Sequence, residues 1–271
     1  MFAEERQQLI VGLIYASGRA SVTDLAERFS ITTETVRRDL AALEAAGSVR
    51  RVHGGAVSPD RFSTTEESIL ERTVQRKSEK TRIAEAALAL IPDGLTGSIL
   101  IDAGSSTEAL AELLAARAGA GASGSLPASG ADAELVVITH SLPIASRLSG
   151  EPGIALHLLG GKVRGLTQAA VGQSTVEAAR RIRPDIAFIG TNGIHAAFGL
   201  STPDPEEAAV KAAFVQSARR IVVLADSSKL DAETLVQFAS LKDLDTLITD
   251  TQPSRELATA LAEAGVEVVV A

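Results

Sequence analysis

The hydrophobic pattern of residues 1–57 predicts three short helices and a β-hairpin. Apolar residues recur three and four positions apart within 4–15, 22–29 and 33–46, and this spacing places them on one face of a helix. Residues 49–57 then alternate like two short strands around a tight His-Gly-Gly turn. This order of elements is that of a winged helix-turn-helix domain.

After residue 80 the pattern changes to alternating strands and helices. Helical stretches such as 107–117 and 206–218 separate short apolar runs. Such alternation is typical of an α/β domain, in which helices cover both faces of a mainly parallel sheet. Ligands of these sheets bind at the carboxyl ends of the strands. The predicted strands are 98–102, 135–139, 154–159, 186–190, 220–225, 245–249 and 266–270.

These patterns predict two domains joined by a linker. A chain of 271 residues is long enough for two domains. Residues 58–79 are polar and contain Pro59, so we expect a linker with one short helix around 66–72. The predicted division is a winged helix-turn-helix domain at 1–57, the linker at 58–79 and an α/β domain at 80–271.

The composition excludes several kinds of site. Cysteine is absent, which rules out disulfides and cysteine-based zinc or iron–sulfur sites. The four histidines do not have the spacing of a metal site, and we expect neither a metal ion nor a cofactor. Glu4 and Glu5 replace the basic start of a signal peptide, and no run approaches the length of about 18 apolar residues that a membrane helix needs. We therefore expect a cytoplasmic protein that does not enter a membrane.

The distribution of charge favours nucleic acid as a partner of the N-terminal domain. The net charge of the chain is −8, but residues 1–57 contain seven arginines against seven acidic residues. Within 45–57 there are two arginines and no acidic residue. The net charge alone argues against nucleic acid as a partner, but a locally basic stretch attached to an acidic body keeps DNA binding open for this domain.

Hydroxyl and guanidinium groups gather at the start of the third predicted helix and on the hairpin. At the start of a recognition helix they can reach base edges and phosphates in the major groove, and on a wing they can contact the backbone. The alternative is a small helical domain for protein contacts, in which the arginines form a solvated face. The candidate DNA-binding residues are Thr32, Thr33, Thr35, Arg37, Arg38, Arg50, Arg51 and His53.

Two motifs in this domain resemble those of the DeoR family of bacterial transcription regulators. They are T-V-R-R-D-L at 35–40, in the predicted recognition helix, and R-V-H-G-G-A at 51–56, in the predicted wing. The resemblance implies that this domain binds double-stranded operator DNA.

Polar residues gather at five consecutive strand ends of the predicted α/β domain, while the strands themselves are apolar. Hydroxyls and backbone amides at a helix start favour an anion, as do lysines and arginines. Because the carboxyl ends of parallel strands share one edge of the sheet, we expect a polar, anion-binding pocket there. The candidate ligand-binding residues are Asp102, Gly104, Ser105, Ser106, Thr107, Thr139, His140, Gly161, Lys162, Arg164, Thr191, Asn192, Gly193, Glu207, Lys211, Asp226, Ser228 and Lys229.

The same strand ends resemble the sensor domain of the DeoR family. The matching motifs are D-A-G-S-S-T at 102–107, F-I-G-T-N-G at 188–193, G-L-S-T at 199–202 with Glu207 and Lys211 after it, and D-S-S-K at 226–229. T-H-S at 139–141 departs from the T-N-[ST] that is common in the family. The resemblance implies a fold similar to ribose-5-phosphate isomerase and glucosamine-6-phosphate deaminase.

The resemblance also implies a function. It extends from about residue 4 to residue 270 and implies a transcriptional repressor of sugar utilisation genes that a phosphorylated sugar releases from its operator. The segments T-H-S-L-P-I-A at 139–145 and T-Q-A-A-V-G at 167–172 are most similar to regulators of fructose operons. This similarity suggests fructose 1-phosphate as the effector. Because such regulators bind symmetric half-sites, the resemblance implies a homodimer or homotetramer.

Two other functions remain open from the sequence. The related enzyme folds allow an isomerase or deaminase in which Asp102, Glu207 and Lys229 do acid–base work. A metabolic enzyme, however, does not need an attached winged helix, so we expect a protein that is not an enzyme. A transcriptional activator in place of a repressor also fits the motifs.

One dinucleotide-like motif is discounted. Gly119, Gly121 and Gly124 spell G-x-G-x-x-G, but this motif binds phosphates where it follows a strand and opens a helix. Here it lies within 118–132, a stretch rich in Gly, Ala and Ser that we predict to be a flexible surface loop.

Overall fold

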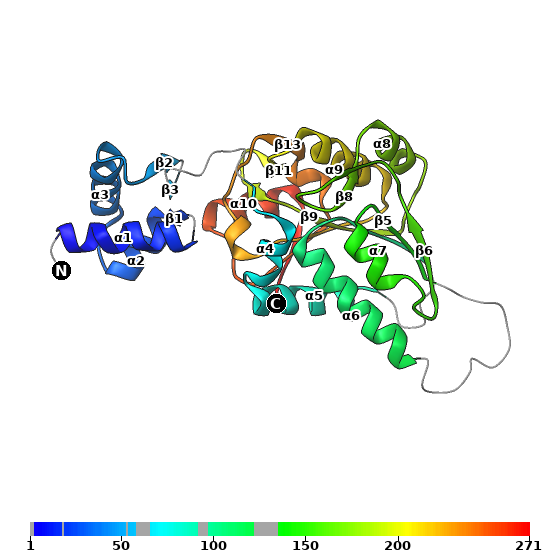
Figure 1. Cartoon of the computed structure of the whole chain (residues 1–271). Coiled ribbons are helices and arrows are strands. Elements are labelled where there is room, and N and C mark those ends of the chain that lie inside the picture. The colour runs from blue at the N-terminus through cyan, green and yellow to red at the C-terminus, as the bar shows by residue number, and fades with distance from the viewer. Residues whose placement is uncertain (1–2, 18, 53, 58–65, 92–96, 122–134) are drawn as a thin grey trace. The chain divides into compact units, whose positions relative to one another are not determined.

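The computed structural model describes residues 3–17, 19–52, 54–57, 66–91, 97–121 and 135–271. The chain divides into two compact units, residues 1–65 and residues 66–271 (Figure 1). Residues from Glu66 onward, part of the segment expected as a linker, therefore belong to the second unit.

The first unit is a helical domain with a small antiparallel sheet. Its helices are α1 (Ala3–Ser17), α2 (Val22–Phe29) and α3 (Thr33–Ala45), and its strands are β1 (Arg19–Ser21), β2 (Arg50–Val52) and β3 (Gly55–Val57). Over the described residues of this unit the strand order is β1-β3-β2, and both pairs are antiparallel. The predicted winged helix-turn-helix arrangement is confirmed.

Strand β1 is an element that the hydrophobic pattern did not predict. It pairs with β3 over only three residues, from Arg19 opposite Val57 to Ser21 opposite Gly55. Gly55 permits this close approach, because a Cβ there would lie 2.2 Å from the carbonyl oxygen of Ala20. A strand this short has too few positions to show the alternation by which strands are recognised.

The core of the first unit joins the apolar faces that the periodicity predicted. Ile10 and Ile14 of α1 are fully buried against Leu25 of α2 and against Val36 and Leu40 of α3. Removing such side chains from water is the main stabilising contribution in a domain of this size. The same packing leaves the opposite face of α3 turned to solvent.

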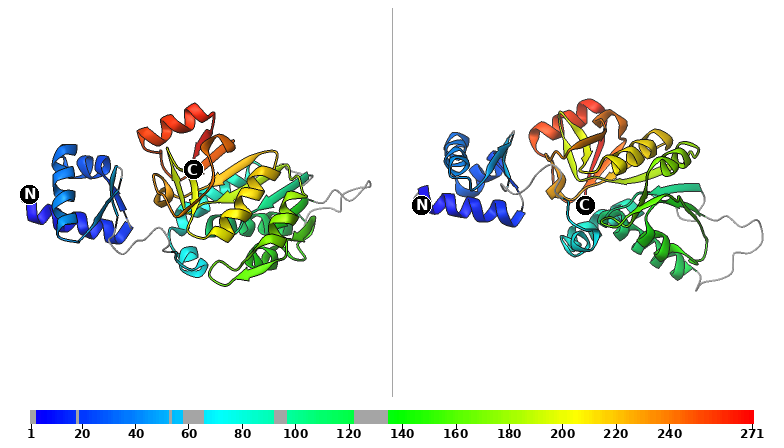
Figure 2. Two further views of the ribbon diagram at one scale, coloured as in Figure 1. Left: turned by 90° about the horizontal axis from the view of Figure 1, so that it is seen from above. Right: turned by 45° about the horizontal axis from the view of Figure 1, so that its top comes forward.

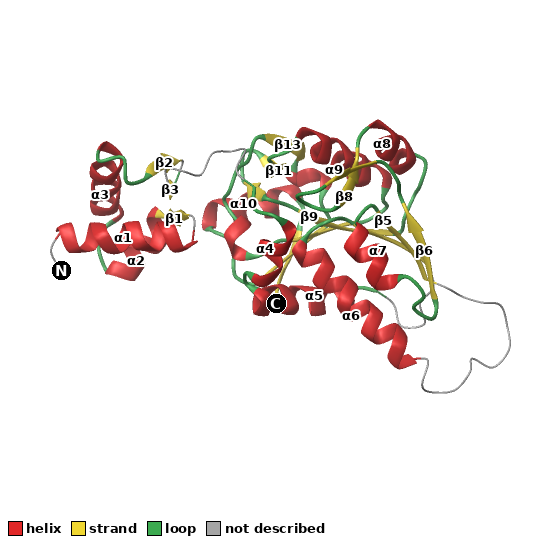
Figure 3. Ribbon diagram, viewed as in Figure 1, coloured by secondary structure: helices red, strands yellow, loops and turns green. Residues whose placement is uncertain are grey.

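The second unit is built on a parallel sheet (Figure 3). Its strands are β4 (Gly97–Ile101), β5 (Leu135–Thr139), β6 (Ile154–Leu158), β9 (Ile186–Gly190), β12 (Ile221–Leu224), β14 (Thr246–Thr249) and β15 (Glu267–Val270). Within the described part of the chain the order is β15-β14-β12-β9-β4-β5-β6, and each neighbouring pair is parallel. These are the strands that the short apolar runs predicted, so the α/β fold class is confirmed.

Helices cover both faces of this sheet (Figure 2). On one face lie α5 (Lys77–Leu88), α6 (Ser105–Gly121) and α7 (Leu142–Leu148), and on the other lie α8 (Gln173–Arg180), α9 (Pro205–Ser217) and α10 (Arg255–Ala264). Side chains along β4 alternate between the two cores: Ile99 and Ile101 pack with the first group of helices, and Leu100 with the second. A strand buried on both faces reads as a continuous apolar run, which is why the sequence pattern revealed it.

Several short elements beside the main sheet were not predicted. Among the described residues, β10 (Gly193–His195), β11 (Gly199–Thr202) and β13 (Val236–Ala239) form one antiparallel sheet, and β7 (Lys162–Arg164) and β8 (Ala169–Val171) form another. In the part of the chain that the structure describes, the 3₁₀ helix η1 (Ser227–Lys229) follows main-sheet strand β12, and the 3₁₀ helix η2 (Leu241–Asp243) follows strand β13.

Two expected boundaries differ from the structure. The segment 58–79 contains α4 (Ile69–Val74) and the start of α5, and Ile69 is buried while its N–H donates to Leu166 O at 2.9 Å.

Helix α6 continues to Gly121, so residues 118–121 are helical rather than part of the predicted loop, because Ala118 packs in the core. Residues 122–132 of that loop lie outside the described residues. Gly119 and Gly121 thus end a helix instead of opening one, in keeping with the dismissal of the dinucleotide motif.

The order of the parallel strands places a crevice between β4 and β9. From β4 the chain proceeds to β5 and β6 on one side, whereas from β9 it proceeds to β12, β14 and β15 on the other. In open α/β sheets, ligands bind outside the carboxyl ends of the strands where the winding reverses in this way.

Candidate functional site

The candidate DNA-binding groups lie at the start of α3 and on β2. Thr32 caps α3, its hydroxyl accepting a hydrogen bond from the N–H of Thr35 at 3.2 Å. Thr35 itself is half-buried, and His53 lies outside the described residues, so a contact from His53 remains a prediction. The other predicted DNA-binding side chains are exposed; they are Thr32, Thr33, Arg37, Arg38, Arg50 and Arg51.

The aspartate of the T-V-R-R-D-L motif faces the interior. Asp39 accepts hydrogen bonds from Arg6 at 2.6 and 3.1 Å and from Gln7 at 3.0 Å, which tie α3 to α1. Burial acts to raise the pKa of Asp39, but the hydrogen bonds and charge of Arg6, with Gln7, hold the pKa below its ordinary value. This pair fixes the helix that presents Arg37 and Arg38 to solvent.

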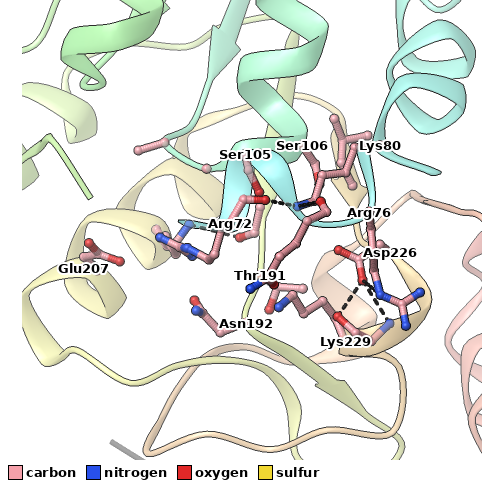
Figure 4. A pocket seen from close by; sticks show the side chains of 17 residues that line it. Arg72, Arg76, Lys80, Ser105, Ser106, Thr191, Asn192, Glu207, Asp226 and Lys229 are labelled. Atoms are coloured by element: carbon pink, nitrogen blue, oxygen red, sulfur yellow. Dashed lines mark hydrogen bonds and ion pairs between the residues drawn. The ribbon is translucent and has the colours of Figure 1, made fainter. Parts of the chain in front are cut away.

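A polar pocket of the second unit lies at the crevice between β4 and β9 (Figure 4). Its walls come from the residues after β4, β9 and β12 and from helices α4, α5 and α9. The cavity volume is about 40 Å³. The lining residues are Arg72, Gln75, Arg76, Lys80, Ala103, Gly104, Ser105, Ser106, Gly190, Thr191, Asn192, Glu207, Lys211, Leu224, Asp226, Ser228 and Lys229.

The lining of this pocket favours an anion. Helix α6 begins at Ser105, and the first amides of a helix have no intrahelical acceptor and carry the positive end of its dipole. Within the described residues the side chains of Ser105, Ser106 and Asn192 make no hydrogen bond. Five cationic side chains line the pocket, against the carboxylates of Glu207 and Asp226.

Two of these cations, Lys80 and Arg76, are held in place by close contacts with their neighbours. The ammonium of Lys80 donates to Arg72 O and, at 2.7 Å, to Gln75 O, and burial lowers the pKa of Lys80. Arg76 Nη1 donates to Ser227 Oγ at 2.8 Å, and its Nε lies 3.8 Å from Asp226. Figure 4 shows the guanidinium of Arg76 beside Asp226, and that of Arg72 on the side of the pocket toward Glu207.

A buried charge network supports the floor of the pocket. Asp102 is 0% exposed and accepts hydrogen bonds from Lys211 Nζ and from Gly190 N–H at 2.9 Å, and its other oxygen lies 3.0 Å from His140 Nε2. Burial acts to raise the pKa of Asp102, but Lys211 and His140 together hold it below its ordinary value. Lys211 also donates to Gly190 O at 3.0 Å, so these groups fix the ends of β4 and β9.

Several predicted ligand-binding residues do not line the pocket. The hydroxyl of Thr139 donates to Ile101 O and that of Thr107 to Gly104 O, and both residues are fully buried. Lys162 is exposed and pairs with Glu206 at 2.7 Å. Arg164 binds three carboxylates, and a Cβ at Gly161 would meet the hydroxyl of Thr175. The predicted residues outside the pocket lining are Asp102, Thr107, Thr139, His140, Gly161, Lys162, Arg164 and Gly193.

Among the pocket residues that were not predicted, three lie in the segment 58–79 that we assigned to a linker, and Lys80 directly follows that segment. Arg72, Gln75, Arg76 and Lys80 come from α4, α5 and the turn between them. The sequence signal was present: Arg72, Arg76 and Lys80 are spaced four residues apart, the spacing that places side chains on one side of a helical segment. Their lining role depends on a turn between two helices, which that spacing alone does not predict.

Neither a metal cluster nor a membrane helix occurs in the described ranges. In these ranges no group of three or more His, Asp or Glu side chains is arranged to hold a metal ion. None of the helices described here combines the length and apolar character needed to cross a membrane.

Comparison with known families matches both units. Residues 6–62 match the family described as "DeoR-like helix-turn-helix domain", and residues 75–251 match "DeoR C terminal sensor domain". The chain is 33% identical to the HTH-type transcriptional regulator GlpR of Haloferax volcanii over 269 residues, covering 99% of this chain and 98% of that protein.

Two Bacillus subtilis proteins are similar over nearly the same length. The HTH-type transcriptional repressor GlcR is 31% identical, covering 100% of this chain and 97% of the relative. The uncharacterized HTH-type transcriptional regulator FruR is 31% identical, covering 93% of each chain. Among solved structures, ribose 5-phosphate isomerase A from Methanocaldococcus jannaschii aligns with a TM-score of 0.40 and 19% identity, covering 58% of this chain and 55% of that one.

Proposed function

This chain belongs to the DeoR family of transcriptional regulators, and we propose that it is a repressor of sugar utilisation genes whose affinity for its operator falls when a phosphorylated sugar occupies the sensor pocket. The observation that carries the proposal is the pocket at the carboxyl ends of β4 and β9. A helix N-terminus and a surplus of cations meet there at the topological switch point of the sheet.

The lining supports a phosphosugar rather than a free sugar. The amides and hydroxyls of Ser105 and Ser106, together with Lys229, offer charge-assisted hydrogen bonds to a phosphate. Asn192 and Glu207 offer partners for sugar hydroxyls. A sugar without the phosphate forfeits the charge-assisted bonds, so its affinity for the pocket is lower.

Fructose 1-phosphate is the effector that we propose for this pocket. The likeness of residues 139–145 and 167–172 to fructose-operon regulators supports it, as does the name of the relative FruR. The other relatives differ in the sugar or operon that their names carry, so the choice among phosphosugars is the part of the proposal that a ligand panel tests.

On the DNA side, we propose that α3 enters the major groove and that β2 contacts the DNA backbone. The exposed Thr33, Arg37 and Arg38 follow the helix cap, and Arg50 and Arg51 lie on the wing strand. Helix-turn-helix proteins read two half-sites as symmetric pairs, which supports a homodimer or homotetramer. Release then requires that the effector bind the DNA-incompetent state more tightly, since equal affinity for both states shifts no equilibrium.

Calorimetric titration of the full chain tests the sensor half of this proposal. Fructose 1-phosphate binds, and fructose does not, at concentrations that saturate the phosphosugar. The Lys229→Ala variant binds fructose 1-phosphate at least ~10-fold more weakly, because a charge-assisted hydrogen bond contributes roughly 1.5–3 kcal/mol. The matched control is Lys242→Ala, which removes an exposed lysine of η2 that does not line the pocket. Equal binding of fructose and its phosphate, or an equal reduction in both variants, contradicts the assignment of the pocket.

A further inference from the structure

Arg72 is a pocket cation whose hydrogen-bonding groups are incompletely used. Its Nε is buried and has no hydrogen-bond partner within the described residues. Its Nη2 lies 3.6 Å from Oε1 of Glu66, a distance at which the two charges attract but do not form a good hydrogen bond. The Arg72 side chain is 13% exposed and the Glu66 side chain 2% exposed, so water can form few hydrogen bonds with these two side chains.

Glu66 is a buried carboxylate whose surroundings disfavour its charged form. Burial and the neighbouring charge of Glu207 raise its pKa, although Arg72 and Arg164 act in the opposite direction. Arg164 contacts Glu66 at 2.7 Å but also Asp204 at 3.2 Å and Glu207 at 3.1 Å, so its charge is divided among three carboxylates. Arg72 is therefore one of two arginines that compensate the charge of Glu66.

Three other cations around the pocket, Lys80, Arg76 and Lys211, have closer partners than Arg72. Lys80 donates to two backbone carbonyls, and Arg76 donates to Ser227 and lies near Asp226. Lys211 is paired with Asp102. Compared with Lys80, Arg76 and Lys211, Arg72 breaks the weakest interaction when it moves, because its Nη2 lies 3.6 Å from Glu66.

We propose that Arg72 is a phosphate-binding residue of the sensor pocket and that the phosphate recruits it in competition with Glu66, so that effector binding weakens the Glu66–Arg72 ion pair. The inference rests on the proposed function and names the residue through which the ligand acts. A guanidinium suits this role because its planar fork can bind two phosphate oxygens at once. Glu66 thereby opposes effector binding and is in turn destabilised by it, as reciprocal coupling requires.

The position of Glu66 in the chain gives this competition a route to regulation. Glu66 is the first residue of the sensor unit, and the chain continues from it into the DNA-binding unit. When Arg72 moves to the phosphate, Arg164 is the arginine that still contacts Glu66, and its charge is shared with two other carboxylates. Occupancy of the pocket therefore changes how firmly Glu66 is held, at the residue where the sensor unit begins.

Titration of the full chain with inorganic phosphate tests the competition directly, because the claim concerns the anion and not the sugar. Thermal unfolding is followed in phosphate and in sodium chloride of equal ionic strength, since a ligand of the folded state raises the melting temperature. Glu66→Gln, which removes the competitor at nearly constant size, tightens phosphate binding by roughly fivefold, equivalent to ~1 kcal/mol. Glu112→Gln, which removes an exposed carboxylate paired with Arg147, is the control for the change in net charge and leaves affinity unchanged.

A double-mutant cycle separates the competition from a simple removal of negative charge. Arg72→Gln weakens phosphate binding by ~10-fold, and in that background Glu66→Gln brings no gain, because no guanidinium remains to be released. Melting temperatures without phosphate report whether each variant is folded. If Glu66→Gln does not fold, Glu66→Asp, which keeps the charge but shortens its reach to Arg72, also tightens binding.

Three results overturn the inference: wild-type chain that phosphate does not stabilise beyond sodium chloride, a Glu66→Gln gain no larger than that of Glu112→Gln, or an equal gain with and without Arg72. Each leaves the proposed function standing if fructose 1-phosphate still releases operator DNA. Conversely, the predicted phosphate pattern together with no effect of any phosphosugar on operator affinity supports the role of Arg72 and contradicts the proposed function.

Discussion

Asp39 is a buried residue that supports the face of α3 that we propose to contact DNA. Asp39→Asn leaves Arg6 without its counter-charge beneath α3, and we expect a loss of about 2 kcal/mol of stability. Chemical denaturation of the full chain checks this. Glu34→Gln is the control, because Glu34 pairs with Arg37 on the surface at 3.7 Å, and exposed pairs contribute about 0–1 kcal/mol. An Asp39→Asn protein as stable as the Glu34→Gln protein contradicts the role given to the pair.

The same residue carries a pH dependence of known sign. The pKa of Asp39 is lower in the folded state than in the unfolded chain. Its stabilisation is therefore complete above the ordinary aspartate pKa of about 3.9 and is lost as the pH falls through the folded-state pKa. The melting temperatures of wild type and Asp39→Asn should differ by a constant amount above about pH 3.9 and converge as the pH falls through the folded-state pKa of Asp39. A constant difference down to the lowest pH excludes this titration.

Asp102 belongs to the support of the pocket rather than to its contact surface. Asp102→Asn leaves Lys211 buried without a counter-charge, for which we expect a loss of about 3 kcal/mol. Denaturant unfolding measures this, with Glu263→Gln, an exposed residue of α10, as the control. If Asp102→Asn is as stable as the control and fails only to bind ligand, Asp102 contacts the ligand instead. Because Asp102 is buried, it is not an exposed carboxylate that could do the acid–base work of an isomerase or deaminase.

At the residue scale, the sequence predicts which polar groups share the sheet edge but not which of them face the cavity. Ser105, Asn192 and Lys229 line the pocket as expected, because the strands before them are parallel neighbours or near neighbours. Lys162 and Arg164 were assigned to it for the same reason, yet both are engaged with carboxylates. Their partners come from segments around 66 and 204–207, and such distant pairings leave no periodic signal.

At the scale of elements, we propose that α3 and β2 have separable roles on DNA. Replacing Arg37 or Arg38 by Ala removes about 1–3 kcal/mol of specific operator binding if the residue reads a base. Replacing Arg50 or Arg51, on the wing, weakens binding to all sequences and lowers the salt slope by about one for each phosphate that the wing no longer neutralises. Gel-shift titrations at several salt concentrations distinguish the two effects, with Arg147→Ala of the sensor unit as control. Unchanged operator affinity in all four variants contradicts the assignment of this face.

The elements that the sequence predicted correctly are those whose own pattern is long enough to show. The strands of the parallel sheet are continuous apolar runs, and α2 and α3 repeat apolar residues at helical spacing. β1 and β7 have three residues each and depend on partner strands. α4 was placed in a linker because its segment is polar, although a capping box formed by Ser68 and Glu71 begins it and buried Ile69 anchors it. Polar composition alone therefore does not distinguish a linker from a short helix that forms one wall of a site.

At the scale of the whole molecule, two units that each have their own core share one chain. The DNA-binding unit and the sensor unit can each retain their activity while the coupling between them disappears, because coupling is a free energy between two sites and not a property of either. The central claim is that occupancy of the pocket by a phosphosugar lowers operator affinity.

Fluorescence anisotropy of a labelled operator, recovered by in vitro selection with the full chain, tests this claim most directly. At a protein concentration that saturates the operator, increasing fructose 1-phosphate should return the anisotropy to that of free DNA, while fructose leaves it unchanged. Other sugar phosphates in the same assay rank the specificity of the pocket. The claim is contradicted if the protein binds the operator and a phosphosugar occupies the pocket, yet the anisotropy remains at the bound value throughout the titration.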